Sequence, residues 1–202
     1  MAVARLSDGS LWLWSPIALD DQLRREIETL GEPRYVVEPN KLHHLALSQC
    51  LAAWPSLRAY APPGLAKKRA DIHFAGELED QPAPPWRDAI DQVCVEGSLA
   101  MTEVLFFHRA SRTCLVGDLI QRFDARMIKK AWQRWLLKAS GLVGEQGSTP
   151  IEWRMSFVHR NRARAALAHA MAWMPETLVI AHGVWAPQNG ARELARGLRW
   201  LA

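Results

Sequence analysis

The sequence is poor in cysteine, and its three cysteines form no recognised metal or redox motif. Cys50, Cys94 and Cys114 are far apart, none belongs to a C-x-x-C pair, and each has apolar neighbours. In such surroundings a cysteine behaves as a small hydrophobic residue. An odd number of scattered cysteines does not favour a disulfide framework. We therefore expect free thiols, which are typical of a protein in a reducing cytoplasm.

The sequence also lacks targeting and membrane-spanning segments. It does not open with a basic leader followed by an apolar stretch, and no apolar run approaches the roughly 20 residues that a membrane helix needs. We expect a cytoplasmic protein with no membrane partner.

Several catalytic signatures are missing as well. There is no G-x-S-x-G nucleophile elbow, no cysteine in an electropositive turn and no glycine-rich phosphate-binding loop. Hydrolases that use these serine or cysteine nucleophiles, and enzymes that cradle nucleotide phosphates, are therefore disfavoured.

Charge of neither sign dominates, because the net charge is only +4 and the charges are dispersed. The two densest basic clusters, residues 67–69 and 159–164, are not accompanied by a nucleic-acid-binding motif. We expect a small-molecule substrate and no nucleic-acid partner.

Tryptophan, in contrast, is abundant, with ten in 202 residues. Trp12 and Trp14 alternate with leucines in an expected strand, and Trp132 and Trp135 are three residues apart, as on one face of a helix. We interpret them as residues of a core or an interface rather than as a base-stacking platform, which leaves a homo-oligomer open.

Hydrophobic residues make up 49% of the chain, enough for a single domain over residues 1–202. Strands and helices alternate. We predict a hairpin around Asp8-Gly9, a helix capped by Asp20 or Asp21, an irregular surface segment at 64–88, and a helical insertion at about 125–150 that ends in a flexible connector. Further strands are expected at residues 35–37, 58–61, 90–95, 103–108, 113–118 and 177–181, and further helices at 45–54, 162–174 and 193–201.

Three of the short apolar runs, each typical of a buried strand, lead into residues that can bind a metal. These residues are His43 and His44, Asp118, and His182. Ligands gather at the carboxyl ends of strands in layered α/β folds, so the four side chains could meet at one point. Three imidazoles and a carboxylate suit zinc or iron.

The same segments resemble the metallo-β-lactamase superfamily. There, a strand runs into His-x-His-x-Asp-His and is followed by a helix and Pro-x-x-x-x-Tyr-Ala; the similar stretches here are residues 39–44 and 55–61. The pairs Gly117-Asp118 and His182-Gly183 resemble the superfamily's strand-ending Gly-Asp and closing His-Gly. Other motifs are similar to an uncharacterised branch known mainly as a domain of unknown function: Ser15-Pro16-Ile17, Pro39-Asn40-x-x-His43-His44, Pro63-Gly64-Leu65 and Phe107-His108-Arg109-x-Ser111-Arg112-Thr113.

The resemblance implies an α/β fold, a four-layer αββα sandwich of metallo-β-lactamase type. It also implies that one of the superfamily's two metal sites is lost. Pro39 and Lys41 stand where the superfamily has its first two histidines, and residues 96–99 replace a third, with Glu103 as the next polar candidate. Lys41 would then place an ammonium near the position of the missing cation.

The second site is implied to survive, with His43, His44, Asp118 and His182 as ligands of one zinc ion, or alternatively iron or manganese. Four protein ligands would leave tetrahedral zinc without an open position, so catalysis would need five-coordination or a loosely held ligand.

We therefore expect a metal-dependent hydrolase in which metal-bound water attacks an ester, thioester or amide. Asp118, Lys41 and Glu103 are the expected catalytic residues, with the Lys41 ammonium directed to Asp118 or Glu103; Glu103 either pairs with Lys41 or faces solvent. The alternative is a non-catalytic module that binds a small molecule or a protein on the same fold, which Pro39 and Lys41 favour.

Overall fold

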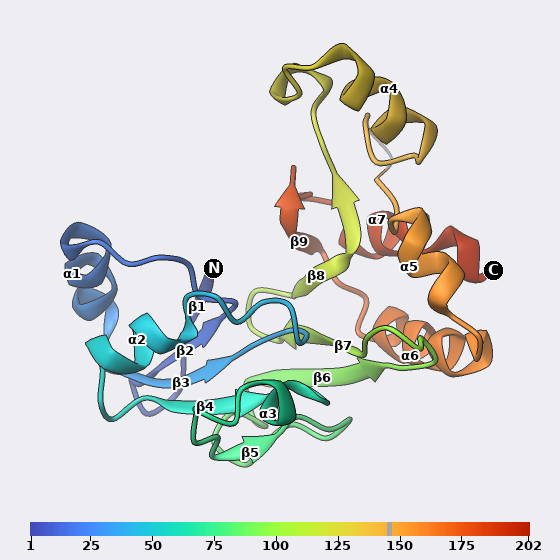
Figure 1. Cartoon of the computed structure of the whole chain (residues 1–202). Helices are drawn as coiled ribbons and strands as arrows, with labels where there is room; N and C mark the ends of the chain where they lie inside the picture. The colour runs from blue at the N-terminus through green and yellow to red at the C-terminus, as the bar shows by residue number, and fades with distance from the viewer. Residues whose placement is uncertain (145–146) are drawn as a thin grey trace. The chain divides into compact units, whose positions relative to one another are not determined.

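The computed structural model describes residues 1–144 and 147–202 and consists of two compact units, Met1–Asp91 and Gln92–Ala202. Each unit is built on one β-sheet with helices packed against it (Figure 1). The sequence prediction of a single domain over residues 1–202 stays a prediction.

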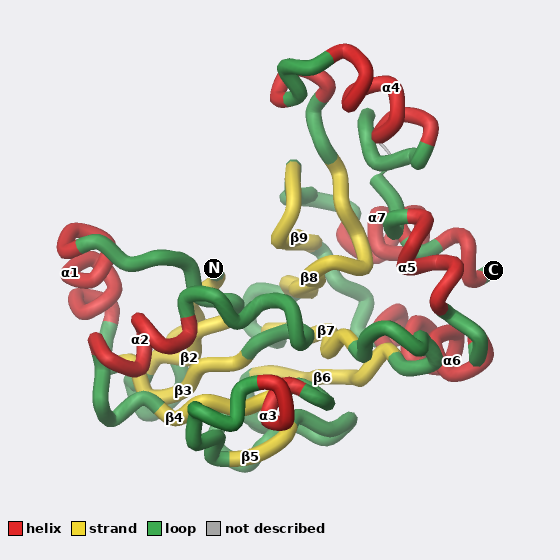
Figure 2. Tube along the Cα trace, viewed as in Figure 1, coloured by secondary structure: helices red, strands yellow, loops and turns green. Residues whose placement is uncertain are grey.

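The sheet of the first unit runs in the order β1-β2-β3-β4-β5 (Figure 2). Its strands are β1 Ala2–Arg5, β2 Leu11–Trp14, β3 Pro33–Val37, β4 Arg58–Ala61 and β5 Gly76–Glu77. The first two strands are antiparallel and the others pair in parallel. The predicted hairpin is confirmed, because Asp8 accepts hydrogen bonds from the backbone and hydroxyl of Ser10 and Gly9 takes the positive φ that the turn requires.

Helices α1 Asp21–Leu30 and α2 Leu47–Ala53 cover one face of this sheet. The predicted cap of α1 is confirmed, since the Asp20 side chain accepts a hydrogen bond from the backbone N–H of Leu23 at 2.7 Å. Alternation along β2 directs Leu11 and Leu13 into the cluster with the helices, so that Trp12 and Trp14 belong to the opposite face.

The segment from 64 to 88 is only partly the surface excursion that the sequence predicts. It includes the short helix α3 Leu65–Lys68 and strand β5, and three of its side chains, Leu65, Leu78 and Trp86, are buried. The Trp86 ring lies edge-on to Tyr60, with ring centroids 4.7 Å apart, and close to Trp12 and Tyr35. The prolines and charged residues around Trp86 are typical of an exposed loop, so the sequence does not indicate that Trp86 is buried.

The sheet of the second unit runs in the order β6-β7-β8-β9. Its strands are β6 Ile90–Val95, β7 Glu103–His108, β8 Thr113–Arg122 and β9 Thr177–Gly183. Strand β7 is antiparallel to β8, and β8 is parallel to β9. Helices α6 Arg160–Ala172 and α7 Gly190–Gly197 contribute Ala163, Ala166 and Leu194 to the core beside this sheet, and α5 Ile151–Ser156 and a 3-10 turn, η2 Arg199–Leu201, complete the unit.

The predicted helical insertion follows β8 as a 3-10 turn, η1 Ala125–Met127, and helix α4 Ala131–Ala139. Trp132 and Trp135 are not part of the core, because they are 61% and 69% exposed, and their predicted place in an interface stays a prediction. The flexible connector predicted at 141–150 is wrong where it is described, since Ser148 pairs with Gln121 and residues 147–150 are buried. Its residues 145 and 146 lie outside the described part of the chain.

None of the described helices is long and apolar enough to cross a membrane.

Candidate metal centre

Asp118 lies in an irregular stretch of β8. The predicted strand end at Asp118 is wrong, because β8 continues to Arg122, but its pairing with β9 is interrupted. Val116 pairs with Ile180, and Gln121 pairs with His182. Between these two pairs β8 advances by five residues and β9 by only two. This bulge redirects the chain and presents Asp118, which is 6% exposed.

A bulge removes backbone amides from the ladder, and those amides need other acceptors when they are buried. The carboxylate of Glu103, on β7, provides them. It accepts hydrogen bonds from Gly117 N–H at 2.9 Å and Asp118 N–H at 2.7 Å, and weaker ones from Leu119 N–H at 3.2 and 3.3 Å. Glu103 is fully buried, so the alternative that it faces solvent is wrong. Its observed contacts make it a positioning residue for Asp118.

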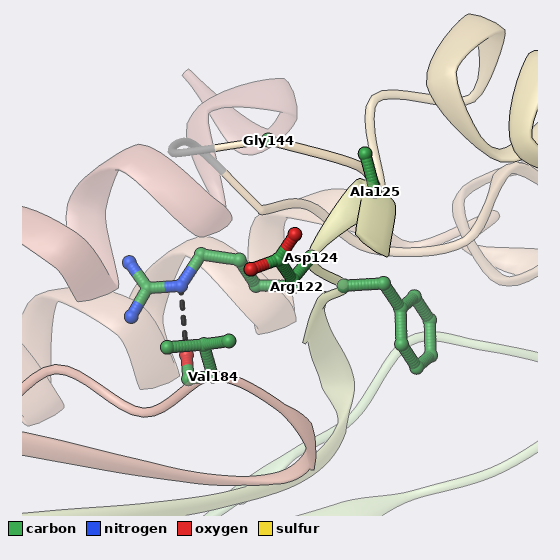
Figure 3. Close-up of a pocket in the computed structure, with 6 residues that line it drawn as sticks. Arg122, Asp124, Ala125, Gly144 and Val184 are labelled. Atoms are coloured by element: carbon green, nitrogen blue, oxygen red, sulfur yellow. Dashed lines mark hydrogen bonds between the residues drawn. The ribbon is translucent and has the colours of Figure 1, made fainter. Parts of the chain in front are cut away.

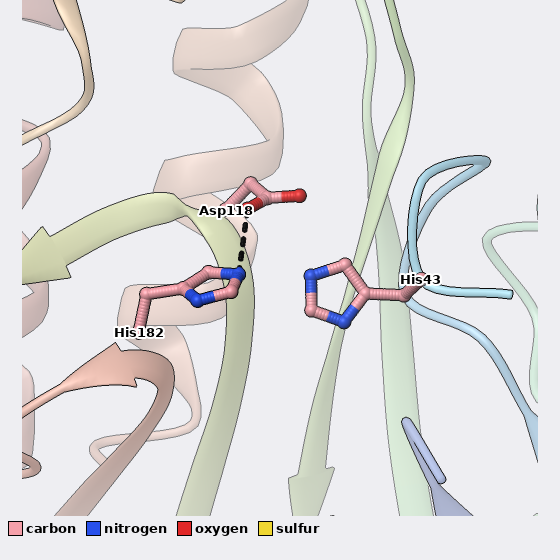
Figure 4. A group of neighbouring side chains, drawn as sticks. All are labelled: His43, Asp118 and His182. Atoms are coloured by element: carbon pink, nitrogen blue, oxygen red, sulfur yellow. Dashed lines mark ion pairs between the residues drawn. The ribbon is translucent and has the colours of Figure 1, made fainter. Parts of the chain in front are cut away.

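His182 lies near the end of β9, one residue later than the predicted strand end and inside the observed strand. Its Nε2 is 3.0 Å from Oδ1 of Asp118 (Figure 4). The hydrogen bond that His182 donates to Asp118, and the negative charges of Asp118 and Glu103, raise the pKa of His182 against the opposing effect of burial. The Asp118 oxygen is also 3.5 Å from the amide nitrogen of Gln121.

His43 belongs to the first unit, in the loop after β3. Its Nδ1 is 2.7 Å from the hydroxyl oxygen of Ser15. Ser15 ends β2 in a left-handed conformation, with φ of 49°, and is buried. The loop itself is fixed by Asn40, whose side-chain oxygen accepts a hydrogen bond from Leu42 N–H at 2.9 Å. Because Ser15 holds Nδ1, Nε2 is the ring atom of His43 suited to coordinate a metal.

His44 is placed differently from the other predicted ligands. Its Nδ1 is 3.2 Å from a guanidinium nitrogen of Arg69, which also donates to the His44 carbonyl oxygen at 3.3 Å. Burial and the cations Lys68 and Arg69 lower the pKa of His44. Arg69 is in turn held by Asp71 and Ser48. A cation in contact with the ring disfavours a second cation on it, so these contacts argue against His44 as a metal ligand.

Lys41 is partly exposed, and its backbone carbonyl accepts a hydrogen bond from the Lys68 ammonium at 3.1 Å. The catalytic roles expected for Lys41 and Glu103 stay predictions.

A pocket of about 450 Å³ lies where β8 and β9 end (Figure 3). Arg122, which lines the pocket, pairs with Gly183. This pair follows the pair of Gln121 with His182 in the ladder. Its walls are mainly apolar, and Arg122 is turned away to donate from Nε to the Val184 carbonyl at 2.7 Å. The lining residues are Arg122, Phe123, Asp124, Ala125, Gly144 and Val184.

The Asp118–His182 pair fits a metal. Two ligands at about 2.0–2.1 Å from a tetrahedral ion lie about 3.3 Å apart. The 3.0 Å between Asp118 Oδ1 and His182 Nε2 is close to that separation. A carboxylate and an imidazole are ligands that zinc and iron share.

Comparison with protein families identifies the chain. The family described as "Domain of unknown function (DUF4336)" matches residues 1–131, well over half of the sequence. The chain belongs to the DUF4336 family. A search of curated proteins finds no match for this DUF4336 protein.

Solved structures similar to the DUF4336 protein are metallo-β-lactamase-fold proteins. DIM-1 metallo-β-lactamase is 10% identical, with 95% of this chain and 82% of that chain covered and a TM-score of 0.61. The mono-zinc form of metallo-β-lactamase FIM-1 from Pseudomonas aeruginosa is 11% identical, with 96% and 80% covered and a TM-score of 0.58. A peroxy diiron species of the chemotaxis sensor ODP is 10% identical, with 96% and 82% covered and a TM-score of 0.58.

The similar structures confirm the predicted α/β fold of metallo-β-lactamase type, and the family match agrees with the predicted branch known as a domain of unknown function. Sequence reasoning missed two residues of the DUF4336 site, Ser15 and Gln121. The break of β2 at Ser15-Pro16 marks a special backbone position, but nothing local indicates its histidine partner 28 residues away.

Proposed function

We propose that the DUF4336 protein is a metal-dependent hydrolase with one metal ion held by His43, Asp118 and His182. Each of the three side chains offers one ligand atom. The observation that carries the proposal is the Asp118–His182 pair, whose donor atoms are spaced as metal ligands on a fold of metallo-β-lactamase type. His43 joins the set because Ser15 orients its ring and because it stands in the ligand motif that the sequence predicts.

Zinc is the proposed metal, and iron is the alternative, since structures of this fold include both a mono-zinc and a diiron protein. A bound metal of this kind polarises a substrate carbonyl and lowers the pKa of a water molecule toward neutrality. Three protein ligands leave a tetrahedral ion one open position, whereas four would close it. Leaving His44 out of the ligand set therefore makes the site more suitable for catalysis than the four-ligand set predicted from sequence.

The chain's own residues would prepare that site. Glu103 fixes the backbone of Asp118, and Asp118 orients the His182 ring. Asp118 must be ionised and His182 neutral to bind the metal, so metal binding would displace the proton that His182 shares with Asp118.

The pocket beside His182 would receive the apolar part of an ester, thioester or amide. Its lining is mostly apolar, with Phe123 and Val184 on it, and it begins at the residue pair next to His182. Small-molecule sites are usually concave and apolar with few polar groups, which this pocket matches.

The alternative, a non-catalytic binding module, is favoured by one observation. Asp118 and His182 already satisfy one another in an ion pair, as a degenerate site would.

Zinc- and iron-loaded protein should be screened against generic ester, thioester and amide substrates, together with the variants Asp118→Asn and His182→Ala. The exposed His73 provides the matched control His73→Ala. The hydrolase proposal predicts activity that follows metal content, is lost in both site variants and is kept in the control. Activity that persists in both site variants would contradict it, and metal binding without hydrolysis of any substrate would favour the binding module.

A further inference from the structure

Helix α4 has an apolar face that the described part of this chain leaves uncovered. None of its nine residues is buried. Trp132, Trp135 and Leu136, at positions i, i+3 and i+4, are 61%, 69% and 47% exposed. Their spacing places them on one side of the helix. In Figures 1 and 2, α4 lies beyond the end of β8, away from α6 and α7 of its own unit.

The charges around this face have one sign. Between Asp124 and Glu145 the sequence contains no acidic residue. The same stretch has five exposed cations, of which Arg126 is paired with Asp124; the others are Lys129, Lys130, Arg134 and Lys138. Isolated helices this short are marginal in water, so α4 would gain from a partner that covers its apolar face and neutralises its charges.

We propose that the segment from 125 to 140, here called the α4 segment, binds the surface of an anionic lipid membrane. Tryptophan rings are favoured at the boundary between headgroups and acyl chains, and lysine and arginine are attracted to anionic headgroups. A helix with an apolar face bordered by cations is typical of peripheral attachment in the plane of the membrane. The sequence expectation of no membrane partner rested on the absence of spanning segments, which peripheral binding does not need.

Two other partners fit these residues less well. In a symmetric dimer built on this face, the five cations of one copy would meet those of its partner. An acidic protein would need to cover a convex helix. A lipid surface accommodates a convex helix and supplies many negative charges at once.

Co-sedimentation of the full chain with vesicles tests the proposal. We expect binding to vesicles of equal parts phosphatidylcholine and phosphatidylglycerol, little binding to phosphatidylcholine alone, and weaker binding at high salt. The double variant Trp132→Ala, Trp135→Ala should lower the partition coefficient at least about tenfold, because two aromatic side chains no longer enter the interface. The matched control Trp185→Ala removes a tryptophan that is 51% exposed outside the α4 segment and should leave binding unchanged.

The charge contribution has its own pair of variants. Lys129→Glu combined with Lys130→Glu should lower the partition coefficient at least about tenfold. Arg25→Glu combined with Lys67→Glu makes the same change in net charge at exposed positions of the first unit and should have little effect. Circular dichroism should show that each variant is folded, because the substituted residues of the α4 segment are exposed.

Three results would overturn the proposal. The first is no binding to anionic vesicles. The second is an equal loss of vesicle binding in the α4 variants and in their control variants. The third is binding to neutral vesicles as strong as binding to anionic vesicles. Tight binding of a single-stranded oligonucleotide that the tryptophan variant abolishes, without vesicle binding, would assign the α4 segment to nucleic acid instead.

Discussion

Replacing Glu103 by glutamine changes a side chain that holds the bulge of β8. The carboxylate accepts from Gly117 N–H through Oε1 and from Asp118 N–H through Oε2. A glutamine keeps one acceptor oxygen and turns an NH₂ group toward the other amide, so one charge-assisted hydrogen bond is lost and a buried donor is left without an acceptor. We expect Glu103→Gln to lower the free energy of unfolding by about 2.5–6 kcal/mol, from about 1.5–3 for the bond and about 1–3 for the orphaned donor.

Because the bulge positions Asp118, the same change should weaken metal binding. Substitutions of residues that orient metal ligands lower affinity by about 10–100-fold. Urea denaturation measures the stability, and competition with a chromogenic chelator measures the zinc affinity of the folded variant. Glu96→Gln is the matched control, because Glu96 is exposed at the end of β6 and its ion pair with Arg162 is long, at 3.3 Å. We expect the control to change stability by less than about 1 kcal/mol.

The two roles considered for Glu103 give different results. A positioning residue predicts loss of stability and of metal affinity together. Hydrolysis abolished with stability and zinc affinity both unchanged would refute the positioning role and restore the catalytic one that the sequence predicts.

Three further substitutions have defined outcomes. Ser15→Ala should lower zinc affinity about 10–100-fold, measured by chelator competition, because the His43 ring loses its orienting partner; unchanged affinity would exclude His43 Nε2 as a ligand. Glu38 is buried, makes no hydrogen bond in the described part of the chain, and has a pKa raised by burial, so stability should fall as the pH rises above the carboxyl's usual 4.5. Glu38→Leu should remove this decrease of stability with rising pH, and should stabilise the protein at pH 8 by about 1–3 kcal/mol in thermal or urea unfolding. Destabilisation would show that another group stabilises the Glu38 carboxylate. Gly183→Ala should destabilise by about 3 kcal/mol or more, because its φ is +111° and a Cβ would lie 1.9 Å from the Arg122 carbonyl oxygen; a folded variant with an unchanged melting temperature would contradict this packing.

Much of the fold could be predicted because its signals are local. The Asp8-Gly9 turn, the Asp20 cap and the alternation of leucine and tryptophan in β2 each lie within a few residues of the structure they determine. The order of apolar runs, together with the paired motifs at Asp118 and His182, was enough to indicate a fold of metallo-β-lactamase type.

The unpredicted features depend on contacts between distant residues. The bulge of β8 is visible only when its pairing with β9, more than 60 residues later, is known. Glu103 acquires its role from amides 14 to 16 residues away. The separation of His43 from His44 depends on Ser15 and Arg69, which contact one ring each. The sequence predicts two ligands in this adjacent pair, and we propose one.

Helix α4 shows a different limit of pattern reading. Its spacing of tryptophans predicts an apolar face correctly, but the pattern does not say whether that face meets the core or a partner outside the chain. The exposure of Trp132 and Trp135 shows that this face does not meet the core.

The measurement that tests the central claim most directly is the metal content of the purified protein and four histidine and aspartate variants. Elemental analysis after zinc loading and gel filtration should find one ion per chain in the wild type, in His44→Ala and in the exposed control His73→Ala. Asp118→Asn and His182→Ala should lose the ion, because each removes one of three ligands. Two ions per chain, no retained ion in the wild type, or loss of the ion in His44→Ala as complete as in His182→Ala would contradict a single metal held by His43, Asp118 and His182.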